Sequence, residues 1–256
     1  MNNECDFNPN KPVGATGPVT LVRPIMEQFN KYAEQGLQCS IDPGAPGVPE
    51  GAKQYFKKYG YLIIKNLYDA NQLKTEIPNF SGQINYYGSL DKFHHELEEK
   101  QVPGSLARYS YPPYKEAHSK IRIILEDILG EKLYNTYYYD RIYRAGQQLV
   151  RHSDRSACEI SVSVQIGSNL GEPWSFCLET LEEKEIAANL QDGWGLLYMG
   201  CRVEHWRDPL KYKNRKIKRG LYKILRKPDD TYWHQVFFHY VRQNGEFAHC
   251  AWDKAR

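Results

Sequence analysis

The sequence has few cysteines for its length, no long apolar run and little net charge. Its six cysteines show no CxxC spacing and are too sparse in 256 residues for a disulfide scaffold, so reduced thiols are expected. No run of about 18 apolar residues occurs, which excludes a membrane-spanning helix. The first residues, MNNECDFNPNKPVG, contain neither the basic segment nor the apolar run of a signal peptide. We therefore expect a cytoplasmic protein without a membrane partner.

Charge and length narrow the class of protein only slightly. The 34 basic and 31 acidic residues leave a net charge of +3, which by itself indicates no partner. A chain of 256 residues can bury a sizeable core as one large domain. Residues 1–50 are rich in Pro, Gly and Asn and are expected to form an extended, partly disordered arm. Residues 51–256 are then expected to form a single domain.

The first part of that domain, residues 51–132, is expected to be mainly helical. Tyr61–Ile64 is a compact apolar strand, and Asp69 after it is a helix-start signal. Residues 91–101 (DKFHHELEEKQ) are charged and rich in helix formers, which predicts a solvated helix. In residues 117–130, isoleucine and leucine recur at helical spacing and a glycine ends the pattern. This predicts an amphipathic helix that covers a core and carries no chemistry.

From residue 133 onwards the pattern changes to short strands separated by turns. The expected strands are LYNTYYYDRIYR, QQLVRHSD, CEISVSVQIG, PWSFCLET, GWGLLYMG, CRVEHW and WHQVFFHYV. Strands of this length, with repeated Gly, Asn and Asp turns, indicate a closed or double-sheet β architecture. The sequence therefore predicts an α+β fold in which N-terminal helices pack on a β-barrel or jelly roll formed by residues 133–256.

Three residues with suitable spacing form a candidate metal site. His152 and Asp154 are two positions apart at the end of an expected strand, so both side chains can point at one ion. His205 follows 51 residues after Asp154, within a later expected strand. Two neutral imidazoles and one carboxylate on one octahedral face are the ligand set of non-haem iron(II) sites, which leave the other positions open. A set with His239 in place of His205 is the alternative.

Strand order and motif order between residues 55 and 250 match those of a known family. The matching stretches are YGYLIIKN, LYNTYYYDRIYRAGQQLVRHSDRSACEIS, GWGLLYMGCRVEHWRDPL and HQVFFHYV. Through them the chain resembles the prolyl-4-hydroxylase-like branch of the Fe(II)/2-oxoglutarate-dependent oxygenases, including bacterial and phage members. The resemblance implies a distorted double-stranded β-helix, cupin-like, with iron near one mouth. It also implies that 2-oxoglutarate and O2 are converted to succinate and CO2 while a C–H bond of an amino-acid side chain, prolyl or other, in a peptide or free, is hydroxylated.

The resemblance further implies a pocket for the 2-oxoglutarate cosubstrate. Tyr143, nine residues before His152, is implied to be a pocket tyrosine, because the family counterpart of its strand helps to hold 2-oxoglutarate. Family members usually place an Arg or Lys about ten residues after the distal histidine, where its charge-assisted bonds anchor the far carboxylate. Here a basic stretch fills that interval, so spacing leaves the anchor open. Arg207 is the first candidate, and His234 is the second, with Gln235 as a polar neighbour.

A basic insertion separates the last two expected strands. Residues 211–227 contain nine Lys or Arg residues, two tyrosines and no acid. Such a composition can bind phosphates through its charges and stack bases on its aromatic rings. One alternative is therefore an oxygenase that this insertion directs to nucleic acid or ribosomal targets. The other is a non-catalytic, cupin-like binding protein that has lost the cosubstrate, since the carboxylate anchor is open.

Overall fold

Two β-sheets of unequal size form the framework of the structure, a computed structural model that describes residues 38–43, 48–213 and 230–253. Most of the expected N-terminal arm lies outside the described residues, and so does the expected basic insertion apart from residues 211–213. The part of the arm at residues 38–43 includes a short strand, which runs parallel to the strand formed by Tyr61–Ile64. This segment of the arm is therefore an edge of the larger sheet.

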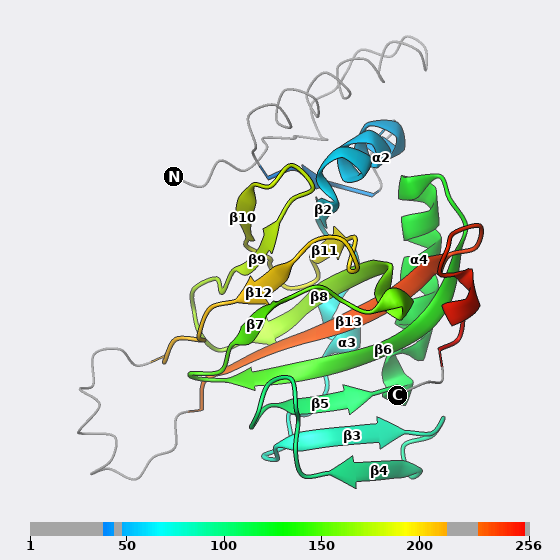
Figure 1. The fold of residues 1–256 in the computed structure, drawn as a ribbon. Coiled ribbons are helices and arrows are strands. Elements are labelled where there is room, and N and C mark those ends of the chain that lie inside the picture. The colour runs from blue at the N-terminus through cyan, green and yellow to red at the C-terminus, as the bar shows by residue number, and fades with distance from the viewer. Residues whose placement is uncertain (1–37, 44–47, 214–229, 254–256) are drawn as a thin grey trace.

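The larger sheet has nine strands and the smaller sheet has four. In spatial order the larger sheet contains β1 (Ser40–Ile41), β2 (Tyr61–Ile64), β11 (Gly195–Tyr198), β8 (Ile160–Ser168), β13 (Tyr232–Arg242), β6 (Leu133–Arg144), β5 (Leu106–Tyr109), β3 (Gly82–Tyr86) and β4 (Phe93–Glu96). The smaller sheet contains β10 (Glu185–Ala188), β9 (Phe176–Glu179), β12 (His205–Arg207) and β7 (Leu149–His152). Figure 1 shows the smaller sheet over one face of the larger one.

The face of the larger sheet that meets the smaller sheet can be followed along β13, the strand between β6 and β8. Because side chains alternate along a strand, Trp233, Gln235, Phe237 and His239 share one face of β13. Arg207 of the smaller sheet donates from Nη2 to Gln235 Oε1 over 2.6 Å. We call this the inner face, and the space between the two sheets the barrel interior.

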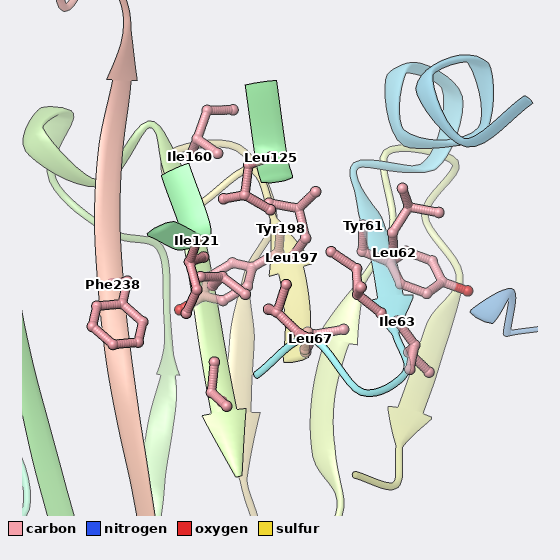
Figure 2. Close-up of a cluster of buried hydrophobic side chains, with 14 of the residues drawn as sticks. Tyr61, Leu62, Ile63, Leu67, Ile121, Leu125, Ile160, Leu197, Tyr198 and Phe238 are labelled. Atoms are coloured by element: carbon pink, nitrogen blue, oxygen red, sulfur yellow. The ribbon is translucent and has the colours of Figure 1, made fainter. Parts of the chain in front are cut away.

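The outer face of the larger sheet is covered by helices. They are α2 (Val48–Tyr59), the short α3 (Ala70–Leu73) and α4 (Lys115–Leu129). Ile121 and Leu125 of α4 lie next to Phe238 and Ile160 of the sheet in the hydrophobic core, part of which Figure 2 shows. Helix α4 is capped at its C-terminus by Gly130, whose φ of 62° is the left-handed conformation that glycine adopts most easily. Burial of this apolar stripe holds the helix on the sheet.

Most of the elements expected from the sequence are present. The seven strands expected after residue 133 correspond to β6, β7, β8, β9, β11, β12 and β13. The helix expected at 117–130 is α4, and the strand expected at Tyr61–Ile64 is β2. Asp69 is the N-cap of α3, where its carboxylate accepts a hydrogen bond from the backbone N–H of Asn71 at 2.9 Å. The predicted combination of helices and facing sheets is confirmed.

The helix predicted for residues 91–101 is wrong. Phe93–Glu96 is instead the edge strand β4, which pairs antiparallel with β3 through a turn that contains Gly88 at a φ of 88°. Helix propensity is a weak local preference, and pairing with a neighbouring strand overrides it here. His94 and His95 of this strand are nevertheless exposed to solvent, as expected. The stretch expected to be mainly helical, residues 51–132, thus also supplies β3, β4 and β5 to the larger sheet.

Two further expectations concern the membrane and the cysteines. Within the described ranges, no helix combines the length and the apolar character needed to cross a membrane. The five cysteines that these ranges contain are all free thiols. Reduced cysteines were the expectation for them.

Candidate metal centre

Two antiparallel strands of the smaller sheet bring the candidate ligands together. His152 ends β7, His205 begins β12, and the two residues are directly paired across these strands. Their ring centroids are 4.4 Å apart, and the Nε2 atoms lie 3.7 and 3.6 Å from Asp154 Oδ1. One ligand atom from each of the three residues lies within 4.8 Å of the other two. Strand pairing and the HxD spacing therefore place the three predicted ligands around one point.

Backbone carbonyls orient both imidazoles. Nδ1 of His152 donates to Val150 O at 2.8 Å, and Nδ1 of His205 donates to Val203 O at 3.1 Å. With the proton on Nδ1, each Nε2 has a free lone pair, which is the form of histidine that binds a metal. Both lone pairs are on the side of the Asp154 carboxylate. The local backbone thus fixes the tautomer that the site needs.

The Asp154 carboxylate is positioned from behind by β8 and by the end of β11. The backbone N–H of Asp154 donates to Gly200 O at 2.8 Å, and the Ser161 hydroxyl donates to Asp154 Oδ2 at 3.2 Å. A Cβ at Gly200 would lie 2.6 Å from this Oδ2 and 2.3 Å from the carbonyl oxygen of Cys158. Position 200 therefore has no room for a side chain. Because glycine has none, the Asp154 carboxylate can lie close to the backbone that follows β11.

Burial sets the electrostatics of the three ligands. It raises the pKa of the Asp154 carboxyl to about 6 and lowers the pKa of the His205 imidazole to about 4. Burial also lowers the pKa of His152, and the neighbouring His205 adds to this effect. Both imidazoles are consequently neutral at pH 7, as metal binding requires. A bound cation would supply the positive charge that the buried carboxylate otherwise lacks.

Metal affinity is expected to decrease below pH 6, by about tenfold or more for each pH unit. A proton on Asp154 competes with the metal once the pH falls below the raised pKa of about 6. An ordinary aspartate, with a pKa near 3.9, would compete only below about pH 4. His205 stays neutral to about pH 4, so it adds no proton in this range. Equilibrium dialysis of Zn(II) between about pH 7.5 and 5 measures the dependence, and a constant affinity would contradict it.

His239, the alternative third ligand, lies in a different group. It is within reach of Asp154 and Cys158 rather than of His152, and its Nδ1 is 2.9 Å from the Ser161 hydroxyl. Burial raises the pKa of the Cys158 thiol well above its usual value, so this thiol stays protonated and is a poor ligand. The set with His205 therefore fits a metal better.

The side chain of Gln101 covers the metal-facing side of His152. Its amide Nε2 lies 3.1 Å from His152 Nε2 and donates to it, because Nδ1 already carries the ring proton. Gln101 belongs to the segment between β4 and β5, which also contributes the buried Val102 to a small apolar cluster with Tyr143 and Trp174. A metal ion at His152 Nε2 would take the place of this amide.

Of the four residues predicted to hold the cosubstrate, three lie in the barrel interior: Arg207, Gln235 and Tyr143. Arg207 is fully buried, and its guanidinium lies over the rings of Trp174, Phe176 and Trp233 at 4.5, 5.0 and 5.6 Å. It donates to the backbone oxygen of Trp174 and to the side chain of Gln235. No carboxylate among the described residues forms an ion pair with Arg207, and burial lowers its pKa to about 10. The structure thus brings together Arg207, Gln235 and, on the adjacent strand, Tyr143.

Several hydrogen-bond donors around Arg207 have no acceptor in the described part of the chain. They are Arg207 Nε, Gln235 Nε2, the hydroxyl of Tyr143 and Trp233 Nε1. Buried donors without acceptors are rare in native proteins and point to a missing ligand or water. A cation with a free N–H group, and three further N–H or O–H groups around it, fit a carboxylate. Trp174 and Trp233 were not predicted for this pocket, although the alternation of side chains along the last strand puts Trp233 on the face of Gln235.

His234, the second candidate for the carboxylate anchor, is on the other face of β13. Its Nε2 lies 2.7 Å from Asp140 Oδ2, and Asp140 also pairs with Arg108 on the outer side of the sheet. Adjacent residues of a strand point to opposite faces, so Gln235 and His234 cannot both reach the barrel interior. The structure does not bring His234 to the pocket.

A polar groove of about 930 Å³ opens beside the metal centre. Tyr109 at the end of β5 and Ser110 directly after it line the groove, together with Glu99, Gln101 and Arg155. Gln101 connects the groove to His152, and the charge of Arg155 acts on Asp154. The volume is that of a site for a small molecule or a short peptide segment.

No family model and no curated protein matches this chain. Its fold resembles that of the non-haem α-ketoglutarate-dependent epimerase SnoN from nogalamycin biosynthesis, with a TM-score of 0.51, 12% identity, and coverage of 77% of this chain and 83% of that one. HygX from Streptomyces hygroscopicus, with nickel and 2-oxoglutarate bound, has a TM-score of 0.49 at 11% identity. This match covers 73% of this chain and 85% of HygX. A prolyl-4-hydroxylase from Pseudomonas putida has a TM-score of 0.48 at 11% identity. This match covers 76% of this chain and 99% of the hydroxylase.

At identities this low, only the fold can be compared. The likeness to SnoN extends over more than three quarters of both chains, and the two facing sheets enclose a His-Asp-His cluster. The chain therefore has a double-stranded β-helix fold like that of SnoN.

Proposed function

We propose that the protein is an Fe(II)- and 2-oxoglutarate-dependent dioxygenase that hydroxylates a C–H bond of an amino-acid side chain. The observation that carries the proposal is the convergence of His152 Nε2, His205 Nε2 and the Asp154 carboxylate on one point. This ligand set selects non-haem iron(II) and leaves coordination positions open for other molecules. The candidate substrates are a prolyl-type residue in a peptide and a free amino acid.

The cosubstrate part of the proposal rests on Arg207. An unpaired guanidinium surrounded by donors without acceptors would bind the far carboxylate of 2-oxoglutarate. Gln235 would donate from Nε2 and Tyr143 from its hydroxyl to the same carboxylate. The rings of Trp174 and Trp233 would exclude water from this end of the molecule. The near end of 2-oxoglutarate would then face the metal centre.

The residues of the chain hold and orient the metal, the cosubstrate and the substrate, whereas iron and 2-oxoglutarate supply the oxidising chemistry. Iron and 2-oxoglutarate together activate O2 to remove a hydrogen atom from carbon, with release of succinate and CO2. The backbone bonds to Nδ1 of His152 and His205 keep both rings in the ligating form. The groove of about 930 Å³ admits the substrate on the side of Gln101. Apart from residues 211–213, the basic insertion lies outside the described residues, so nothing in the described part of the chain favours a nucleic acid target.

A calorimetric titration of 2-oxoglutarate into the metal-loaded protein tests this function. We expect one molecule to bind per chain, with an affinity that requires the metal because the ligand contacts both the metal and Arg207. Incubation with Fe(II) and O2 is then expected to produce succinate. Metal binding without 2-oxoglutarate binding would contradict the proposal and leave the non-catalytic, cupin-like binding protein as the function.

A further inference from the structure

Arg141 and Glu99 form a buried ion pair whose hydrogen-bonding groups are only partly used. Arg141 lies on the inner face of β6, is fully buried, and donates from Nη2 to Glu99 Oε1 at 2.9 Å. Its Nε and Nη1 have no acceptor among the described residues, and Glu99 Oε2 has no donor there. Burying a polar group without a partner costs free energy, so such a pair is an unfavourable way to stabilise a fold. A ligand would supply the missing partners.

A second buried ion pair on the same strand provides the comparison. Asp140 precedes Arg141 but faces the outer side of the sheet, where it pairs with Arg108. Tyr114 and His234 lie 3.1 and 2.7 Å from the same carboxylate oxygen. Within the described residues, neither Asp140 nor Arg108 has a buried side-chain atom without a partner. The two pairs are similarly buried, so the unused groups are a property of the inner pair and not of buried ion pairs in this protein.

The inner pair lies between the groove and the metal centre. Glu99 lines the groove, and its Oε1 also accepts from the backbone N–H of Gln101, whose side chain touches His152. The charge of Arg141 in turn lowers the pKa of His152, though less than burial does. The guanidinium lies over the rings of Tyr139 and Tyr143 at 5.2 and 5.7 Å. A molecule held by this pair would therefore be beside the metal.

We propose that Arg141 and Glu99 bind the head group of a free α-amino acid, which is the substrate of the oxygenase. Its carboxylate accepts from one of the two free N–H groups of Arg141, Nε or Nη1, and its ammonium donates to Glu99 Oε2. The side chain of the amino acid then extends toward the metal. This inference rests on the proposed function for the reaction, but the head-group site itself requires only the groups on Arg141 and Glu99.

The chemistry of the unused groups selects this ligand over two others. A free N–H donor on a cation and a free acceptor on an anion match a carboxylate and an ammonium on neighbouring atoms. An internal residue of a peptide has neither charge and would offer no charged partner to the unused N–H groups of Arg141 or to Glu99 Oε2. A dicarboxylate such as 2-oxoglutarate would put a second negative charge next to Glu99, whereas Arg207 has no carboxylate neighbour in the described ranges and suits it better.

Binding measurements on the Zn(II)-loaded protein saturated with 2-oxoglutarate test the inference without turnover. The probes are the twenty protein L-amino acids, screened by thermal shift and measured by calorimetry. For each one that binds, the N-acetyl form and the carboxamide form are measured as well. We expect at least one free amino acid to bind, and each blocked form to bind about 10- to 100-fold more weakly.

Two variants test which residue binds the ammonium of the amino acid and which binds its carboxylate. Glu99→Gln is expected to weaken binding of the free amino acid about 10- to 100-fold and to leave that of the N-acetyl form unchanged. Arg141→Lys is expected to weaken binding of the free amino acid and to leave binding of the carboxamide form unchanged. Asp140→Asn, in the saturated outer pair, is the matched control and is expected to lower stability without changing either affinity.

The outcomes separate this inference from the proposed function. Binding of 2-oxoglutarate with no response to any of the twenty amino acids would overturn the inference alone. Equal binding of free and blocked forms would do the same. Binding of an amino acid to the Zn(II)-loaded protein in the absence of 2-oxoglutarate binding would support the head-group site and reject the oxygenase function. The comparison of free and blocked forms uses the unmodified chain, so it stands even where a variant does not fold.

Discussion

Replacing Asp154 by alanine is expected to lower the affinity for Zn(II) or Fe(II) by more than about 100-fold and to abolish iron-dependent turnover. Asp154 is the only anion among the three ligands, and its Oδ1 lies within 3.7 Å of both Nε2 atoms. Without it, two neutral imidazoles remain, which hold a dication weakly and leave its charge uncompensated in a buried site. Equilibrium dialysis under anaerobic conditions measures the affinity, and succinate formation measures the turnover.

The same substitution is expected to leave the metal-free protein as stable as the unmodified chain, or more stable. The raised pKa of about 6 means that burial disfavours the Asp154 carboxylate, so at pH 7 this charge destabilises the fold when no cation is bound. A melting curve without metal therefore separates loss of a ligand from loss of structure. Asp192→Ala is the control, because burial raises the pKa of that carboxyl too, yet Asp192 is outside the metal cluster. Metal affinity that survives in Asp154→Ala would reject the site.

The parts that sequence reasoning predicted depend on local spacing. His152 and Asp154 share a strand end, so their separation in the sequence fixes their separation in space. Strand β6 has the bounds expected for it, because its run of tyrosines and β-branched residues lies between glycine turns at Gly130 and Gly146. His205 required only that its strand pair with β7, which the order of motifs already indicated.

The parts that it missed depend on contacts between segments distant in the sequence. Glu99 lies in a stretch whose composition favours a helix, and only the folded chain shows that it meets Arg141, 42 residues later. His234 and Gln235 look equally suitable for the pocket in the sequence, but the register of β13 against β6 decides which one faces inward. A one-residue change in register would exchange them, and side-chain chemistry alone does not fix it.

Replacing Arg207 by methionine is expected to raise the dissociation constant of 2-oxoglutarate by more than about 100-fold and to leave metal binding unchanged. The guanidinium is the only charge proposed for the far carboxylate, whereas the metal ligands lie on other residues. In the absence of 2-oxoglutarate, the variant is expected to be at least as stable as the unmodified chain. Burial lowers the pKa of Arg207 to about 10, so its buried charge costs on the order of 3 kcal/mol at neutral pH. Calorimetry and thermal melting measure the two effects.

Gln235→Glu tests the same idea with Arg207 left in place. Gln235 Oε1 lies 2.6 Å from Arg207 Nη2, so a glutamate at 235 would supply the carboxylate that the guanidinium lacks among the described residues. We expect this variant to melt at a higher temperature than the unmodified protein, because the buried cation gains an ionic partner. We also expect it to bind 2-oxoglutarate no better than Arg207→Met does, since the internal carboxylate occupies the anchor. If Arg207 served only to pack the tryptophans, the substitution would change stability but not the affinity for 2-oxoglutarate, and the assignment of Arg207 as the anchor would be wrong.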